Sequence, residues 1–215
     1  MPVYNIGRDA YSLWNSIVDG VAPYLKFRVY GSSASDGYEA YYDAILAGDT
    51  AEMKRLEKVM EINKRDNGKT HLEGLGDGLT SIVKKEYLSG ALPFSKAEEI
   101  LIKYCGRTET GTESAYHDIT AWEYKAATGA TSYSMYIPLR SALLAGDKQG
   151  IEDAYEDLVT HYGKKEKEID SQVPSIIRDA MEDGEIDRQT AERLMREFTD
   201  KTNAEIRKYL DRETK

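Results

Sequence analysis

The chain has 215 residues, of which 31% are charged and 40% are hydrophobic, and its net charge is −9. This profile is typical of a folded soluble protein, and it argues against a surface that grips nucleic-acid phosphates, because such surfaces need clustered Lys and Arg. No apolar run approaches the roughly 20 residues that span a bilayer, and the first residues lack a secretory pattern, so we expect a cytoplasmic protein with no membrane partner. The single cysteine, Cys105, excludes an internal disulfide and fits a reducing compartment.

Residues 1–37 differ in character from the rest of the chain. Within them, LKFRVY at 25–30 alternates apolar Leu25, Phe27 and Val29 with Lys, Arg and Tyr, which is the period of a half-buried β-strand. A single strand needs a partner. Two partners remain open: the flanking sequence, in a small hairpin, or the edge of another chain.

The phrase AILAGD at 44–49 returns as ALLAGD at 142–147. In each copy the glycine, Gly48 or Gly146, can end a helix in the left-handed conformation, and the aspartate that follows can cap the next helix through its carboxylate. The repeated phrase therefore predicts a helix stop followed directly by a helix start, at two places in the chain.

The match between the two halves continues further along. Residues 82–104 align without a gap over 176–198, and both stretches carry apolar residues at the i, i+3, i+4, i+7 spacing of a buried helix face. Agreement in both phrase and period indicates a duplicated unit of four helices. We expect the second helix at about 50–64 or 148–162, the third at about 79–88 or 173–182, and the fourth from Ser95 or from near Asp187.

We therefore predict an all-α fold: two tandem, related four-helix units with a connecting helix, plus a small N-terminal strand or hairpin. The connecting helix is predicted to end at Gly129, and the charged tail from Lys201 to Leu210 is expected to continue the last helix of the second unit. The predicted boundaries are 1–37 for the N-terminal segment, 38–111 for unit one, 112–132 for the connecting helix and 133–215 for unit two.

The second helices of the two units carry opposite charges at equivalent positions. At an offset of 98 residues, three basic residues fall on three acidic ones: Lys54, Arg55 and Lys58 on Glu152, Asp153 and Glu156. These acids and Asp157 are expected to face outward, because a different set forms the buried stripe: Ile151, Ala154, Tyr155, Leu158 and Val159. The acidic side is either a solvated surface or a docking site for the basic face of unit one or for a basic partner protein.

Sixteen tyrosines are spread along the chain, and most are expected in the core or at its rim. Tyr38, Tyr41 and Tyr42 crowd the first helix of unit one. Since recognition surfaces are rich in tyrosine, an exposed cluster at this place is the candidate interface.

Several motifs that would indicate catalysis or cofactor binding are incomplete. The GKT at 68–70 lacks the first glycine of a phosphate loop, since Asn63 stands in its place. The glycine-rich EGLGDGL at 73–79 lacks the frame of a dinucleotide site and is predicted to form a flexible turn. The histidines lie far apart and outside metal-ligand spacing: His71, His117 and His161. We therefore predict no catalytic residue, no metal and no cofactor.

The order of elements in this sequence resembles helical repeat segments of poorly characterised phage and prophage proteins of gut bacteria. The elements are a Tyr-rich helix, LAGD, a charged helix and a Gly-Lys turn, with AYHDITAWEY following the fourth helix. The resemblance covers residues 38–200 and leaves out 1–37. It implies a phage or mobile-element origin and a helical fold, and it brings no catalytic residues. A location in the host cytoplasm or in a virion is then expected.

Three functions are compatible with these observations. The first is a non-enzymatic protein-interaction module, virion-associated or scaffolding, that associates with a protein partner or with itself through apolar patches and complementary charge. The alternative is a phage-encoded acidic inhibitor, of the anti-CRISPR kind, that offers carboxylates where a host nucleic-acid-binding defence protein expects phosphates. The third is an enzyme with a dispersed carboxylate site. None of the three binds nucleic acid directly.

Overall fold

The computed structural model describes residues 34–62 and 70–211. Within these residues the chain is mainly helical, with ten α-helices, one short 3-10 helix and no β-strand. The prediction of an all-α fold is confirmed. The strand predicted at 25–30 and the Gly-Lys turn at 68–69 lie outside the described residues.

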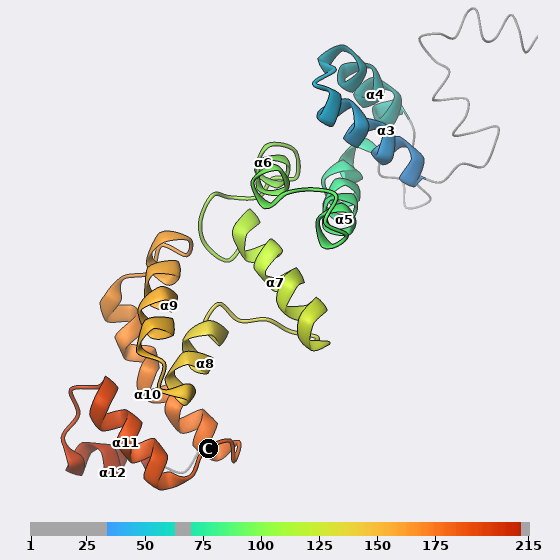
Figure 1. The fold of residues 1–215 in the computed structure, drawn as a ribbon. Coiled ribbons are helices and arrows are strands. Elements are labelled where there is room, and N and C mark those ends of the chain that lie inside the picture. The colour runs from blue at the N-terminus through green and yellow to red at the C-terminus, as the bar shows by residue number, and fades with distance from the viewer. Residues whose placement is uncertain (1–33, 63–69, 212–215) are drawn as a thin grey trace, which may run out of the picture. The chain divides into compact units, whose positions relative to one another are not determined.

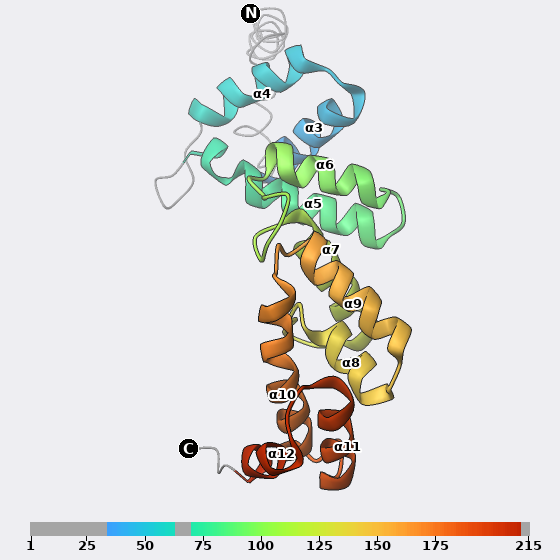
Figure 2. The same cartoon turned by 90° about the vertical axis from the view of Figure 1, so that its left-hand side faces the viewer.

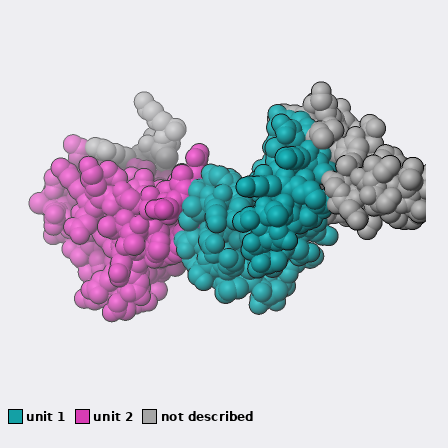
Figure 3. Space-filling view, turned by 90° about the horizontal axis from the view of Figure 1, so that it is seen from above, with its two compact units in different colours: residues 1–107 teal, residues 108–215 magenta. Residues whose placement is uncertain are grey.

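The chain divides into two compact units, residues 1–107 and 108–215, which Figure 3 shows in different colours. The helix predicted as a connection between them belongs to the second unit. The predicted domain boundaries stay predictions.

In unit 1, α3 packs against both α4 and α5, and α5 packs against α6 (Figure 1). Each of these helices directs its apolar stripe inward. In α6, for example, Ala97, Ile100 and Leu101 are fully buried at the spacing of one helix face. The helices of unit 1 are α3 (Ala34–Ala47), α4 (Thr50–Ile62), α5 (Leu75–Leu88) and α6 (Phe94–Tyr104), with a 3-10 turn at Leu72–Gly74 before α5.

In unit 2, α8 packs against α9, and α10 packs against α8, α9 and α11 (Figure 2). The core includes Leu139, Leu158, Ile177 and Leu194, each almost completely buried. The helices of unit 2 are α7 (Ala115–Thr128), α8 (Ile137–Ala145), α9 (Lys148–Thr160), α10 (Glu166–Glu182), α11 (Arg188–Phe198) and α12 (Asn203–Leu210).

Both copies of LAGD join two helices as predicted. Gly48 and Gly146 have φ angles of 69° and 65°, the left-handed conformation that ends a helix. The Asp49 carboxylate accepts a hydrogen bond from the Glu52 backbone N–H at 2.9 Å, and the Asp147 carboxylate accepts one from Gly150 at 3.1 Å. Each aspartate thus satisfies a backbone donor in the first turn of the helix that follows.

The two units share helix pairings, and two pairs of corresponding helices have equal lengths, although α3 and α8 (14 and 9 residues) and α5 and α10 (14 and 17) do not. α4 and α9 have 13 residues each, and α6 and α11 have 11 each. The packed pairs of unit 1 recur in unit 2 at corresponding places. The pair α3–α4 corresponds to α8–α9, the pair α5–α6 to α10–α11, and the pair α3–α5 to α8–α10. This agreement is what a duplicated unit would produce, although duplication itself stays a prediction.

The glycine-rich stretch at 73–79 differs from its prediction. It is not a flexible turn, because α5 begins at Leu75 and includes both Gly76 and Gly78. A Cβ atom on Gly78 would collide with the ring of Tyr38 from α3. Glycine is therefore required at this position by the close approach of two helices.

Three other helix limits differ from the sequence prediction. α6 begins at Phe94 after Pro93, so Ser95 lies inside it and does not cap it. α10 begins at Glu166, well before the expected residue 173, and contains Pro174. The tail does not continue α11, because α12 starts anew after Thr202, whose side chain and that of Glu205 form a reciprocal cap.

Candidate functional site

The outer side of α9 carries an acidic face, which we define as Glu152, Asp153 and Glu156. All three are exposed, because Ala154 and Leu158 direct the opposite side of the helix into the core. Asp153 accepts a hydrogen bond from the Gln149 side chain at 2.9 Å. Within the described residues, Glu152 and Glu156 have no ion pair and no side-chain hydrogen bond.

One residue predicted in the buried stripe of α9 is not buried. Val159 is 42% exposed, whereas Ile151 and Tyr155 are partly buried against the core of unit 2. The stripe is therefore narrower than predicted, because α8 and α10 cover only part of the apolar side of α9.

Asp157, also predicted to face outward, turns toward aromatic side chains. The Tyr116 hydroxyl donates a hydrogen bond to Asp157 Oδ2 at 2.9 Å. His161 Nε2 lies 3.9 Å from the other carboxylate oxygen, Oδ1. Asp157 is thus held by a hydrogen bond within unit 2 and, although its side chain is 45% exposed, it is not counted in the acidic face.

The corresponding side of α4 in unit 1 offers less positive charge than predicted. Lys54 and Lys58 are exposed, but Arg55 is half-buried and forms an ion pair with Glu52 on the same helix, with Nε 2.7 Å from Oε2. This hydrogen-bonded pair lowers the pKa of Glu52 and raises that of Arg55. The guanidinium is therefore already engaged, and the two lysines remain as the basic face.

The tyrosines predicted as an exposed interface are core residues. The side chains of Tyr38, Tyr41 and Tyr42 are 6%, 3% and 7% exposed. Tyr41 donates to the Glu57 carboxylate at 2.6 Å, and Tyr38 donates to the His71 carbonyl at 3.0 Å. The prediction of an exposed tyrosine cluster here is wrong, because α4 and α5 pack over this side of α3.

The structure instead gathers aromatic rings in unit 2. Tyr116 of α7 stacks on His161 with ring centres 3.8 Å apart, and it meets Tyr162 edge-on at 5.9 Å. His117 contacts both Tyr162 and Tyr133, with ring centres 5.7 Å and 5.4 Å away. We call this group the aromatic cluster; its members are Tyr116, His117, Tyr124, Tyr133, His161 and Tyr162.

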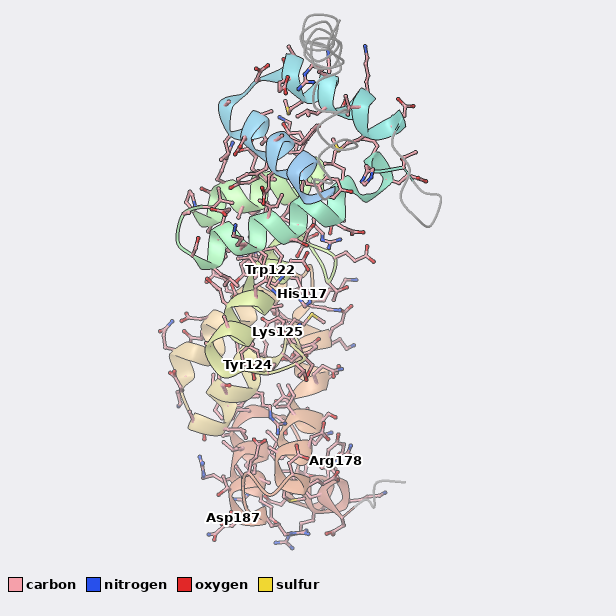
Figure 4. All side chains as sticks on the ribbon, turned by 90° about the vertical axis from the view of Figure 1, so that its right-hand side faces the viewer. His117, Trp122, Tyr124, Lys125, Arg178 and Asp187 are labelled. Atoms are coloured by element: carbon pink, nitrogen blue, oxygen red, sulfur yellow. The ribbon has the colours of Figure 1, made fainter. Side chains whose placement is uncertain are left out.

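Hydrogen bonds within the aromatic cluster hold its polar atoms. The Tyr162 hydroxyl lies 3.3 Å from His117 Nδ1 and 3.5 Å from Thr120 Oγ1. Burial lowers the pKa of His117, so its imidazole is neutral at pH 7. Figure 4 shows His117 and Tyr124 projecting from α7, the helix that contributes half of the aromatic cluster.

A cavity of about 360 Å³ lies beside the aromatic cluster. Its walls come from α7, from the segment between α7 and α8, and from α8 and α9. Most of the lining side chains are aromatic or apolar, and two, Glu123 and Asp157, are carboxylates. The residues that line the cavity are Tyr116, Thr120, Glu123, Tyr124, Tyr133, Met135, Ile137, Pro138, Ser141, Ala154, Asp157 and Tyr162.

Two half-buried tyrosines of unit 2, Tyr116 and Tyr155, are expected to make the protein less stable at alkaline pH. Burial, aided by hydrogen bonds to Asp157 and Asp170, raises the pKa of Tyr116 and Tyr155 above the ordinary value of about 10. The unfolded chain loses these protons near pH 10 while the folded chain keeps them, so the free energy of unfolding is intact below pH 10 and falls as pH rises further. Urea unfolding followed by circular dichroism at pH 8 and pH 10.5 should show this loss.

A matched variant checks the cause of this instability. Tyr116→Phe removes one of the protons concerned, so its loss of stability between the two pH values should be smaller than that of the unchanged protein. Tyrosinate absorbance should show one group of tyrosines that ionises only on unfolding. An equal loss of stability in both proteins would contradict the assignment.

The aromatic cluster was not predicted from the sequence. Its members come from separate parts of the chain, such as His117 and Tyr162, which are 45 residues apart. The surplus of tyrosine was the available signal, and in the sequence it is densest in α3, where three tyrosines fall within five residues, 38–42.

Over the part of the chain that the structure describes, no three His, Cys, Asp or Glu side chains come together in a group that could hold a metal ion. None of the described helices has the length and apolar character needed to cross a membrane. Comparison with protein-family models, with curated proteins and with solved structures found no match for this chain.

Proposed function

We propose that the protein is a non-enzymatic interaction module of phage or prophage origin, built from two duplicated helical units, that binds a basic partner through the acidic face of α9. The observation that carries this proposal is that Glu152 and Glu156 are exposed and form no ion pair among the described residues. The resemblance of the sequence to phage and prophage repeat segments supports the proposed origin.

The acidic face has an energetic cost that a partner would offset. Glu152 and Glu156 are four residues apart on one helix, a like-charge spacing that destabilises a helix by about 0.2–0.5 kcal/mol. A basic surface docked on this face removes the repulsion. It is also steered toward the face before contact, which raises the association rate at low salt.

Two forms of this function are supported by different observations. In a virion-associated or scaffolding protein, the partner includes a second copy of the chain, and the exposed Lys54 and Lys58 of α4 supply the opposite charge. In an acidic inhibitor of a host nucleic-acid-binding defence protein, the carboxylates of α9 take the place of phosphates. The basic face supports the first form, which we favour, because an inhibitor would not need it.

The test neutralises the acidic face without changing the fold. In the triple variant Glu152→Gln, Asp153→Asn, Glu156→Gln, the shapes of the side chains are kept and three charges are lost. We expect partner binding or self-association to fall about tenfold or more, and the binding of the unchanged protein to weaken steeply with salt. Analytical ultracentrifugation reports self-association, and quantitative mass spectrometry of proteins copurified from the host reports the partner.

The matched control makes the same change in charge elsewhere in unit 2. Glu182→Gln, Asp183→Asn, Glu185→Gln removes three exposed carboxylates that pair with Arg178 or Arg140. This control should leave partner binding unchanged. If the two triple variants behave alike, or if neither self-association nor a salt-sensitive partner is found, the proposal is wrong. A monomer with a basic host partner would favour the inhibitor form.

A further inference from the structure

The cavity of unit 2 has the composition of a site for an organic cation. Four tyrosine rings line it, those of Tyr116, Tyr124, Tyr133 and Tyr162, and Met135 adds a polarisable thioether. Two carboxylates, Glu123 and Asp157, are also in its wall. Among the described side chains that line it, none is a lysine, arginine or histidine. Tyrosine rings and carboxylates together attract positive charge.

The contacts of Tyr116 strengthen this attraction. Its hydroxyl donates to the Asp157 carboxylate at 2.9 Å, which pushes electron density into the ring and makes the ring face more negative. His161 stacks against one face of the ring but does not line the cavity. The side of Tyr116 that meets the cavity is therefore not the side covered by imidazole.

The size and the walls of the cavity select the kind of cation. A volume of about 360 Å³ lies at the small end of the range of small-molecule sites. Metal ions in proteins are held mainly by His, Cys, Asp and Glu side chains, and no three of these come together among the described residues. Alkylated ammonium groups are weakly hydrated and apolar at their surface, so they suit aromatic walls.

We propose that this cavity binds an alkylated ammonium group, either on a small free molecule or on a lysine side chain methylated in a partner protein. The cation lies among the tyrosine rings, with Glu123 and Asp157 supplying the opposite charge. This inference goes beyond the proposed function, because Glu152, Asp153 and Glu156 do not line the cavity. Binding at the cavity and binding at the acidic face can therefore fail separately.

The test compares choline with its uncharged analogue of the same shape, 3,3-dimethylbutan-1-ol, by calorimetric titration of the full chain. We expect choline to bind at least about tenfold more tightly, since the two ligands differ in charge and not in size. Equal binding of the two, or binding of neither choline nor a trimethyl-lysine peptide, overturns the proposal. Comparison of choline with that peptide identifies the source: tighter binding of the peptide indicates a partner side chain, and tighter binding of choline indicates a free molecule.

Paired variants locate the binding in the cavity. Tyr124→Leu removes a ring whose side chain is half-buried at the wall, and choline binding should fall about tenfold; Tyr124→Phe keeps the ring and should retain binding. Glu123→Gln should weaken choline binding and leave that of the uncharged analogue unchanged. Circular dichroism verifies that each variant is folded. Full binding by Tyr124→Leu in a folded protein would overturn the assignment of the site.

Discussion

Leu194→Ala is expected to lower the free energy of unfolding of unit 2 by about 2–5 kcal/mol. Leu194 is fully buried in α11, within a core to which α8, α9, α10 and α12 also contribute. Truncation removes apolar contacts and leaves a cavity that the surrounding helices fill only partly. An effect of this size is a large fraction of the stability of an ordinary domain.

Hydrogen exchange measured on peptides from each helix checks this prediction and shows which unit is affected. Ile100→Ala is the matched variant, because Ile100 occupies the corresponding position in α6 and is also fully buried. Since the chain forms two compact units, each variant should accelerate exchange in the helices of its own unit. If Leu194→Ala accelerates exchange equally in α3 to α6, the two units unfold as one.

Gly78→Ala is expected to destabilise unit 1 by about 1–3 kcal/mol, although alanine is the better helix former. The reason is the ring of Tyr38, which occupies the space that the new methyl group would need. Tyr38 is buried and its hydroxyl is held by the His71 carbonyl, so the ring cannot move aside without loss. Urea unfolding, with hydrogen exchange in α3 and α5, measures the effect.

The control for this prediction lies two residues away on the same helix. A Cβ atom on Gly76 would meet the backbone of Cys105 at 3.6 Å, an ordinary contact distance. Gly76→Ala should therefore be neutral or stabilising by up to about 1 kcal/mol, because alanine restricts the unfolded chain. Equal behaviour of the two variants would show that the Tyr38 ring does not dictate the glycine.

The acidic face shows how far helix periodicity leads toward a candidate site. The period of 3.6 residues predicted Glu152, Asp153 and Glu156 on the outer side of α9, and their exposure confirms it. The same reasoning placed Asp157 with them, and its side chain is 45% exposed but turned toward an aromatic neighbour. Asp157 accepts a hydrogen bond from Tyr116, 41 residues earlier, and no local pattern reports such a contact.

The tyrosines show what helix periodicity does not predict. Tyr41 and Tyr116 are alike in sequence terms, since each is an amphipathic ring on a helix. Both are held by a carboxylate, Glu57 or Asp157, but Tyr41 is 3% exposed in a core while Tyr116 lines a cavity. Which of the two meets open space depends on the helices packed around it.

The sequence by itself determined the helix end and helix start at each copy of LAGD. The effect of these junctions is predictable from neighbouring residues, because it depends on backbone angles and on hydrogen bonds within four residues. The residues concerned are Gly48 with Asp49, and Gly146 with Asp147. The tertiary structure alone decided that Gly78 makes room for Tyr38 and that rings from α7 and from the end of α9 share one cavity wall. These outcomes depend on distances between helices, which are set when whole apolar faces pack together.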